Sequence, residues 1–211
     1  RIPEAIEWAH RSFDLGKQVH SPELSAQSQI VLGGLLSGAG QLDAGRSMLE
    51  DAWRSAVAHD LGPEADYCRY AGARSCVALK APQAGQSWVD RRPDHRTRWS
   101  LVDIQSHLVG IRTLLGDFAG AHEAFATMSR RLEASGQPGF GHFPSNPGLL
   151  LARTGEWAEA ERLLLAGLQW AHERQYVLSE LHAAVTLGEL CADQGRTAEA
   201  ETRLAWAADE A

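Results

Sequence analysis

The chain has 211 residues, 44% of them apolar, and its 27 acidic and 20 basic side chains give a formal net charge of −7 at pH 7. A chain of this length buries roughly 70% of the surface that its unfolded form exposes, which suffices for a domain without disulfide or metal staples. The acidic balance argues against a nucleic-acid-binding surface, and no apolar run approaches the roughly 18 residues that span a bilayer.

The first predicted helix runs from Pro3 to about Gln18 and carries one apolar stripe, formed by Ile2, Ala5, Ile6, Ala9 and Phe13. It resembles the second helix of a helix pair, so we interpret residues 1–20 as a half repeat. The last predicted helix reaches Ala211 without the polar capping helix that repeat arrays use at their ends. From these two ends we expect residues 1–211 to be a fragment of a larger protein.

A four-residue signature recurs at a nearly fixed spacing. It consists of a glycine, a small residue five positions later, a bulky apolar residue four later, and a small or apolar residue three later. The occurrences are Gly40/Gly45/Leu49/Ala52, Gly116/Ala121/Phe125/Met128, Gly155/Ala160/Leu164/Gly167 and Gly195/Ala200/Leu204/Ala207. The leading glycines lie 76, 39 and 40 residues apart, so the first interval holds two units. A period of about 38–40 residues is typical of a solenoid of stacked helix pairs.

Each signature predicts two antiparallel helices joined by a tight turn. Its glycine closes the first helix in the left-handed conformation, and the small residue lies where the two helices approach closely. We therefore expect an all-α solenoid of helix hairpins that forms a single domain over residues 1–211. The expected repeats cover residues 26–60, 66–95, 102–132, 141–175 and 181–211. The repeat at 66–95 is degenerate, because Lys80-Ala81-Pro82 replaces the glycine turn and only Ala73, Gly85 and Val89 keep the register.

Two repeats also carry a Leu-Gly pair that begins eight residues before the turn glycine, namely Leu32-Gly33 and Leu187-Gly188. Glycine inside a helix costs up to about 1 kcal/mol relative to alanine, so its recurrence at one register predicts close packing against the second helix. Together these residues resemble the tetratricopeptide repeat family, whose pattern has Leu-Gly in the first helix and glycine at the turn. The resemblance covers nearly the whole chain, although the units are longer than the usual 34 residues.

Longer units are similar to the helical-repeat sensor region of large bacterial ATP-binding regulators that end in a LuxR-type DNA-binding domain. The resemblance is carried by Gly45-Arg46-Ser47-Met48-Leu49-Glu50 and Ala158-Glu159-Ala160-Glu161-Arg162-Leu163-Leu164. It implies a right-handed superhelix whose first helices line a concave groove. It also implies a non-catalytic sensing module of a cytoplasmic bacterial transcriptional regulator, with ATP and DNA bound elsewhere in that protein.

The groove would bind a protein, a peptide or a small-molecule inducer. Mapped from the Leu-Gly register, the side chains expected there are Gln27, Tyr67, Arg74, Asp103, Ser106, His142, His182 and Glu189. Such a mixture of charges suits a peptide or a small polar ligand better than duplex DNA. The alternative function is a general scaffold that docks a peptide or a partner helix, and a more remote one is an accessory domain of an enzyme.

Two segments interrupt the repeats. Four arginines lie within residues 91–98, namely Arg91, Arg92, Arg96 and Arg98, and their guanidinium groups suit an acidic partner or a phosphate. An exposed inter-repeat loop is the simpler interpretation of that run. Residues 135–148 are rich in Gly and Pro and should shorten the first helix of their unit, either as a functional loop or as a slack connector.

Seven tryptophans are many for this length. Five fall on predicted second helices, where we expect most of them to pack between helices: Trp8, Trp53, Trp157, Trp170 and Trp206. The other two, Trp88 and Trp99, flank the arginine run, and we expect them to be exposed recognition aromatics.

No catalytic or metal-binding pattern occurs in the sequence. There is no GxxxxGK[ST], GxGxxG or GxSxG motif, and none of the nine histidines falls in an HxxxH or HExxH spacing. We therefore expect no enzyme activity, no cofactor and no metal. The three cysteines, Cys68, Cys76 and Cys191, form no CxxC pair, which indicates reduced thiols and a cytoplasmic location.

Overall fold

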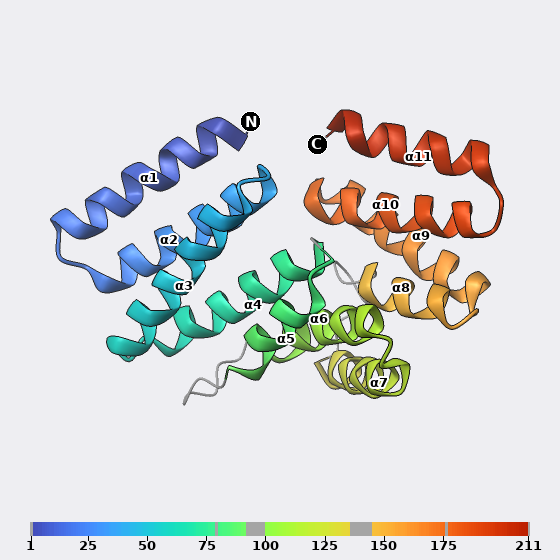
Figure 1. The fold of residues 1–211 in the computed structure, drawn as a ribbon, viewed down its shortest axis with the longest axis horizontal. Coiled ribbons are helices and arrows are strands. Elements are labelled where there is room, and N and C mark those ends of the chain that lie inside the picture. Colours follow the sequence, from blue (N-terminus) through green and yellow to red (C-terminus); the bar gives the residue numbers. More distant parts are fainter. Residues whose placement is uncertain (1, 79, 92–99, 136–144, 176, 211) are drawn as a thin grey trace. The chain divides into compact units, whose positions relative to one another are not determined.

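The computed structural model describes residues 2–78, 80–91, 100–135, 145–175 and 177–210 (Figure 1). This part of the chain is all-α, with no strand among its residues. Its helices, in chain order, are α1 (Ile2–Gln18), α2 (Pro22–Gly38), α3 (Leu42–Ala58), α4 (Gly62–Ala78), α5 (Pro82–Asp90), α6 (Ser100–Leu115), α7 (Phe118–Ser135), α8 (Ser145–Arg153), α9 (Trp157–Glu173), α10 (Val177–Asp193) and α11 (Thr197–Glu210). The prediction of an all-α fold is therefore confirmed.

The chain divides into two compact units, Arg1–His107 and Leu108–Ala211, whose boundary lies within α6. In the first unit α2 packs against α1, α3 and α4, while α3 and α5 each pack against α4. In the second unit α9 packs against α8 and α10, and α10 also packs against α8 and α11. The arrangement of all repeats in one domain stays a prediction.

The tight turns between helices have one common conformation. At the glycine turn after α2, the Gly40 amide donates to Ser37 O over 3.1 Å and the Gln41 amide donates to Leu36 O over 2.9 Å. These two bonds form a Schellman motif, which requires a left-handed residue at its centre. Such residues, with φ between 51° and 85°, are His20, Gly40, Asp60, Lys80, Gly116, Gly155, Gln175 and Gly195.

All four signature glycines are thus in the predicted left-handed conformation. The degenerate repeat closes in the same way, because the Lys80 amide donates to Val77 O over 3.0 Å and the Ala81 amide donates to Cys76 O over 2.8 Å. In the first unit the left-handed residues recur every 20 residues, from His20 to Lys80. Each helix with its turn therefore forms a block of constant length there.

The glycines inside α2 and α10 have the packing role that the sequence predicts. A β-carbon at Gly33 would lie 2.8 Å from Leu49 Cγ of α3, and one at Gly188 would lie 2.8 Å from Leu204 Cγ of α11. Both distances are shorter than real side chains tolerate. The bulky signature residue of the second helix therefore occupies the space that a side chain on the first helix would need.

Apolar cores join successive helices within each unit. In the first unit Ala9 of α1 packs with Leu32 and Leu36 of α2, and Met48 of α3 packs against them. The core of the second unit joins α8, α9 and α10 and consists of Leu151, Ala160, Leu163, Leu164, Leu187 and Leu190. Each cluster therefore joins one helix pair, α2–α3 or α8–α9, to the helix that precedes or follows it.

The degenerate repeat differs from the expected register by one residue. Trp88 of α5 is 3% exposed, and a β-carbon at Gly72 of α4 would lie 2.3 Å from its indole ring. Val89, which the sequence places at the bulky signature position, is only half-buried. The expectation that Trp88 is an exposed recognition aromatic is wrong, because the missing side chain at Gly72 makes room for the indole.

Three other tryptophans are more exposed than expected. Trp8, Trp157 and Trp206 have exposed fractions of 62%, 44% and 38%. The prediction of packing between helices is wrong for Trp8 and Trp206, whereas the Trp157 indole contacts α8 by donating to Ala152 O over 3.1 Å. The buried face of their helices is marked by small residues, such as Ala9 and Ala160. The first helix after residue 135 is described over nine residues, Ser145–Arg153; its expected shortening by residues 135–148 stays a prediction, because residues 136–144 lie outside the described part.

Candidate functional site

Three of the predicted groove residues, Gln27, Tyr67 and Arg74, lie on the adjacent helices α2 and α4 of the first unit. A hydrogen bond and a close approach show which residues of the two helices lie opposite each other. Gln27 Nε2 donates to Glu64 Oε1 over 2.9 Å, and the Arg74 guanidinium lies 3.5 Å from the position of a β-carbon on Gly34. Between these contacts the two helices run side by side (Figure 1).

The surface between the two contacts is apolar and aromatic. Val31 of α2 and Tyr67 of α4 are 47% and 48% exposed. The Tyr67 ring stacks on Tyr70, with ring centroids 5.9 Å apart and an interplanar angle of 16°. We call Gln27, Val31, Tyr67, Tyr70 and Arg74 the tyrosine face.

Aromatic contacts hold the rings of the tyrosine face in place. Tyr70 lies against the buried His107 of α6 with ring centroids 5.1 Å apart. The Arg74 guanidinium carbon lies 5.6 Å from the Tyr70 centroid, which is within the range of a cation–π interaction. Tyr70 therefore links α6 to Arg74 and supports the more exposed Tyr67.

Arg74 has no acidic partner within hydrogen-bonding or ion-pairing distance among the described residues. Its half-buried guanidinium lies near the Tyr70 ring, with the guanidinium carbon 5.6 Å from the ring centroid. This contact with Tyr70 is not a hydrogen bond, so the guanidinium keeps N–H donors for an acceptor. The tyrosine face thus combines an exposed aromatic ring with an anion-binding group.

The other groove candidates do not join the tyrosine face. Ser106 of α6 is fully buried, so its hydroxyl does not lie on an exposed surface. The backbone of Asp103 lies in α6, but its side chain is outside the described residues, and so is the whole of His142. His182 and Glu189 both lie on α10 of the second unit, where His182 is exposed and Glu189 is half-buried.

Arg91, the first residue of the arginine run, makes contacts within the chain. Its guanidinium carbon lies 3.6 Å from the ring centroid of Trp88 and 5.3 Å from that of Trp53, and it forms an ion pair with Glu50 of α3. These contacts attach the end of α5 to α3. Arg92, Arg96, Arg98 and Trp99 lie outside the described residues, so the proposed acidic-partner loop stays a prediction.

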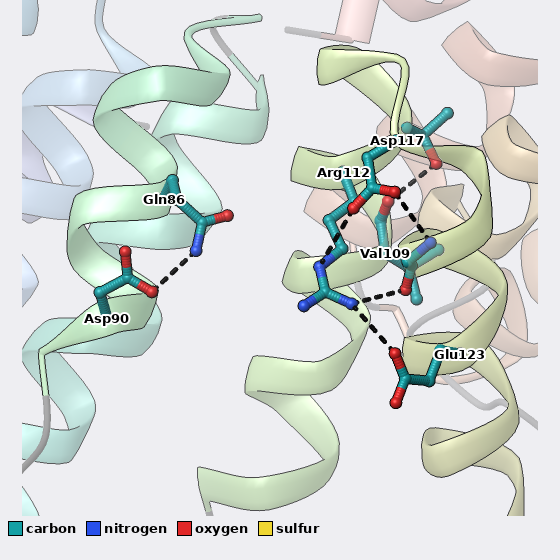
Figure 2. A network of polar contacts seen from close by, with 8 residues as sticks. Gln86, Asp90, Val109, Arg112, Asp117 and Glu123 are labelled. Carbon is teal, nitrogen blue, oxygen red and sulfur yellow. Dashed lines mark hydrogen bonds and ion pairs between the residues drawn. The ribbon is translucent and has the colours of Figure 1, made fainter.

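A second arginine cluster stabilises the turn between α6 and α7. Arg112 Nη1 donates to Gly120 O over 2.7 Å, and its guanidinium forms long ion pairs of 3.8 Å with Asp117 and 3.9 Å with Glu123 (Figure 2). Asp117 accepts in turn from the Gly120 amide over 2.9 Å, which satisfies a free donor in the first turn of α7. This network therefore links the end of α6 to the first turns of α7.

The buried cysteines are poorly suited to nucleophilic chemistry. Burial raises the pKa of the Cys68 thiol to about 12 and also raises the pKa of Cys76, and only a thiolate is an effective nucleophile. All three cysteines are free and buried. In the described part of the chain no three His, Cys, Asp or Glu side chains come together as metal ligands.

Comparison with protein-family models and with curated proteins gives no match to this chain. The resemblance to tetratricopeptide repeats therefore depends on the chain's own residues, such as the turn glycines. Among the helices described, none combines the length and the apolar character that crossing a membrane requires.

Sequence reasoning missed Val31 and Tyr70. It located Gln27 and Tyr67 thirteen residues before the left-handed residues Gly40 and Lys80, and both side chains are exposed. Tyr70 falls three residues after Tyr67, a spacing that brings two rings together on a helix. That spacing is the signal that could have revealed the stacked pair.

Proposed function

We propose that this chain is a non-catalytic binding domain whose repeats form a right-handed superhelical solenoid, and that it recognises its ligand with the first helices of those repeats. The observation that carries this proposal is the tyrosine face. Three side chains predicted from one repeat register, Gln27, Tyr67 and Arg74, lie on two contacting helices with an exposed ring and an available guanidinium. Exposed aromatic and arginine side chains are the groups that contribute most often to binding energy at protein surfaces.

Within this proposal, the domain is the ligand-sensing part of a cytoplasmic bacterial transcriptional regulator of the LuxR type. Support comes from the sequence resemblance of the longer repeats, in particular Gly45-Arg46-Ser47-Met48-Leu49-Glu50 and the similar run that begins at Ala158. In such a regulator, ligand binding would change the curvature of the helical array and so signal to the DNA-binding part. The buried free cysteines fit a reducing compartment.

The second candidate function is a docking scaffold that binds a peptide or helix without a small-molecule signal. It is favoured by the openness of the tyrosine face, since Val31 and Tyr67 are both nearly half exposed. Small-molecule sites usually bury most of the ligand in a concave pocket. An accessory role in an enzyme has less support, because the perturbed thiols are buried and poorly nucleophilic.

Two parallel assays test the proposal and separate its forms. The full chain is screened for thermal stabilisation by a metabolite panel, since a ligand stabilises the folded state by RT ln(1 + [L]/Kd), and it is used as bait for binding proteins. Both assays are repeated with a Tyr67→Ala/Arg74→Gln variant and with Leu165→Ala, a control at a residue of α9 that is 40% exposed.

A metabolite that stabilises the wild type and the control but not the double variant supports the sensor. A protein captured with the same dependence supports the scaffold. If every interaction found is unaffected by the double variant, the tyrosine face is not the binding site and the proposal loses its main support.

A further inference from the structure

The length of the tyrosine face indicates the size of its ligand. Its polar ends are marked on α4 by Glu64, which accepts from Gln27, and by Arg74. These residues are ten positions apart, which corresponds to about 15 Å along a helix. An extended peptide rises about 3.3 Å per residue, so four or five peptide residues would cover the face, whereas a small organic acid would contact only one end.

The charge of the face indicates the chemistry of the ligand. Arg74 carries the only formal charge among the five residues of the tyrosine face, and the neighbouring Glu64 is 8% exposed and accepts a hydrogen bond from Gln27. Since the Arg74 guanidinium contacts Tyr70 without a hydrogen bond, its planar fork of N–H groups can match a carboxylate, which accepts two of them at once. Val31 and Tyr67 beside it offer apolar surface.

We infer that the tyrosine face binds an extended peptide segment with an Asp or Glu side chain on Arg74 and an apolar or aromatic side chain on Tyr67 and Val31. This inference rests on the proposed binding function and specifies its ligand. Gly34 contributes to the site, because the guanidinium lies 3.5 Å from where its β-carbon would be. A longer side chain at Gly34 would reach the atoms that the peptide carboxylate needs.

The experiment begins with selection of phage-displayed random heptapeptides against the full chain. We expect the selected peptides to carry Asp or Glu close to an aromatic or branched aliphatic residue. The tightest one is then synthesised with a fluorophore, and its Kd is measured by fluorescence anisotropy. The variants are Arg74→Gln, which removes the charge, and Gly34→Glu, which supplies a competing carboxylate from the chain itself.

Both variants should weaken peptide binding by about 10- to 100-fold, the usual effect of losing hydrogen bonds between charged groups. Arg162→Gln is the matched control, because Arg162 is an exposed arginine of the second unit with its own partner, Glu159; it should leave Kd unchanged. Changing the peptide's Asp or Glu to its amide should weaken binding to the wild type but cause no further loss with Arg74→Gln. Circular dichroism melts verify that each variant is folded.

Selected peptides that bind Arg74→Gln and Gly34→Glu as tightly as the wild type would overturn this inference, while the proposed binding function would stand on another surface. A selection that enriches no acidic residue, or no peptide at all, would overturn it too. The metabolite screen would then decide the proposed function independently.

Discussion

The helix pairs α2–α3 and α4–α5 form turns of the same conformation although their sequences differ. The first has glycine at both special positions, with Gly40 in the turn and Gly33 against Leu49. The second has Lys80 in the turn, and its close contact is between Gly72 and Trp88. Nevertheless both turns form the same two backbone hydrogen bonds.

This comparison shows that the backbone hydrogen bonds and the interhelical contact determine the turn, while glycine at its centre removes a steric cost. A left-handed residue with a side chain loses about 1–2 kcal/mol relative to the right-handed conformation, and the folded structure tolerates that loss at Lys80. The interhelical contact is less tolerant, since Leu49 and Trp88 each occupy the space that a side chain on the facing glycine would need. Four substitution experiments test this ranking.

The largest effect is expected for Trp88→Ala in the α4–α5 pair. Removing a buried aromatic side chain costs about 3–5 kcal/mol, and Arg91 also loses a ring on which it stacks. Trp8→Ala is the control, because Trp8 is 62% exposed and should lose less than about 1 kcal/mol. Urea unfolding followed by circular dichroism measures both, and equal losses would mean that α5 does not depend on its interior contact.

Adjacent glycines of α2 give the next largest contrast. Gly33→Ala should destabilise the chain by about 1–3 kcal/mol, because the new methyl group would overlap Leu49. Gly34→Ala should stabilise it by up to about 1 kcal/mol, since its methyl group meets only the end of Arg74 and alanine favours the helix. Thermal unfolding of the two variants checks the signs, and a stabilising Gly33→Ala would contradict the proposed close contact.

Raising the pH above 9 should lower the stabilising contribution of Cys68 in α4 but not that of the corresponding residue in α2. Burial raises the pKa of Cys68 from 9.0 to about 12, so the folded state keeps a proton that the unfolded state loses above pH 9. The stabilising contribution of the neutral thiol is complete below pH 9 and is lost as the pH rises from 9 to 12, by about 1 kcal/mol per pH unit.

The measurement compares the free energies of unfolding of the wild type and Cys68→Ala between pH 8 and 10.5. The advantage of the wild type should shrink as the pH rises. The corresponding position of α2 is the buried Ser28, which does not titrate in this range, so Ser28→Ala is the control and its difference should be independent of pH. A pH-independent Cys68→Ala difference would show that the thiol is accessible to solvent.

The smallest effect concerns the turn residues themselves. Gly40→Ala should cost about 1 kcal/mol, because alanine has to adopt a φ of +78°. Lys80→Gly should change stability by less than about 1 kcal/mol, since relief of the left-handed side chain is offset by the greater freedom of glycine in the unfolded chain. Melting temperatures measure both, and a larger loss for Lys80→Gly than for Gly40→Ala would contradict the view that glycine removes a steric cost at the turn.

Much of the fold could be predicted from the sequence, because the glycine turns recur with the helix pairs. The first helix was expected from Pro3 to Gln18 and is Ile2–Gln18. Which side chain of α5 points into the core could not be predicted. Trp88 and Val89 are adjacent bulky residues, and only the space at Gly72 decides between them. The exposure of Trp8 and Trp157 was missed because small residues such as Ala9 and Ala160, and not the tryptophans, mark the buried face of their helices.

The candidate site was predicted in part. Counting back from the turns located Gln27, Tyr67 and Arg74, because residues of one register share a helix face. Tyr70 could not be located in this way, since its role depends on contacts with His107 of α6 and with Arg74. Such contacts depend on how far one repeat is shifted along the next, and the residue pattern of a single helix does not contain that information.

The 20-residue interval between left-handed residues in the first unit limits how this protein can change in length. Deleting one residue within a helix rotates everything beyond it by about 100°, so the interior face and the next turn would both be misaligned. Natural variation by insertion or deletion should therefore occur in whole blocks of helix plus turn. Shorter insertions and deletions should be found only in residues 92–99 and 136–144, which lie outside the regular 20-residue interval.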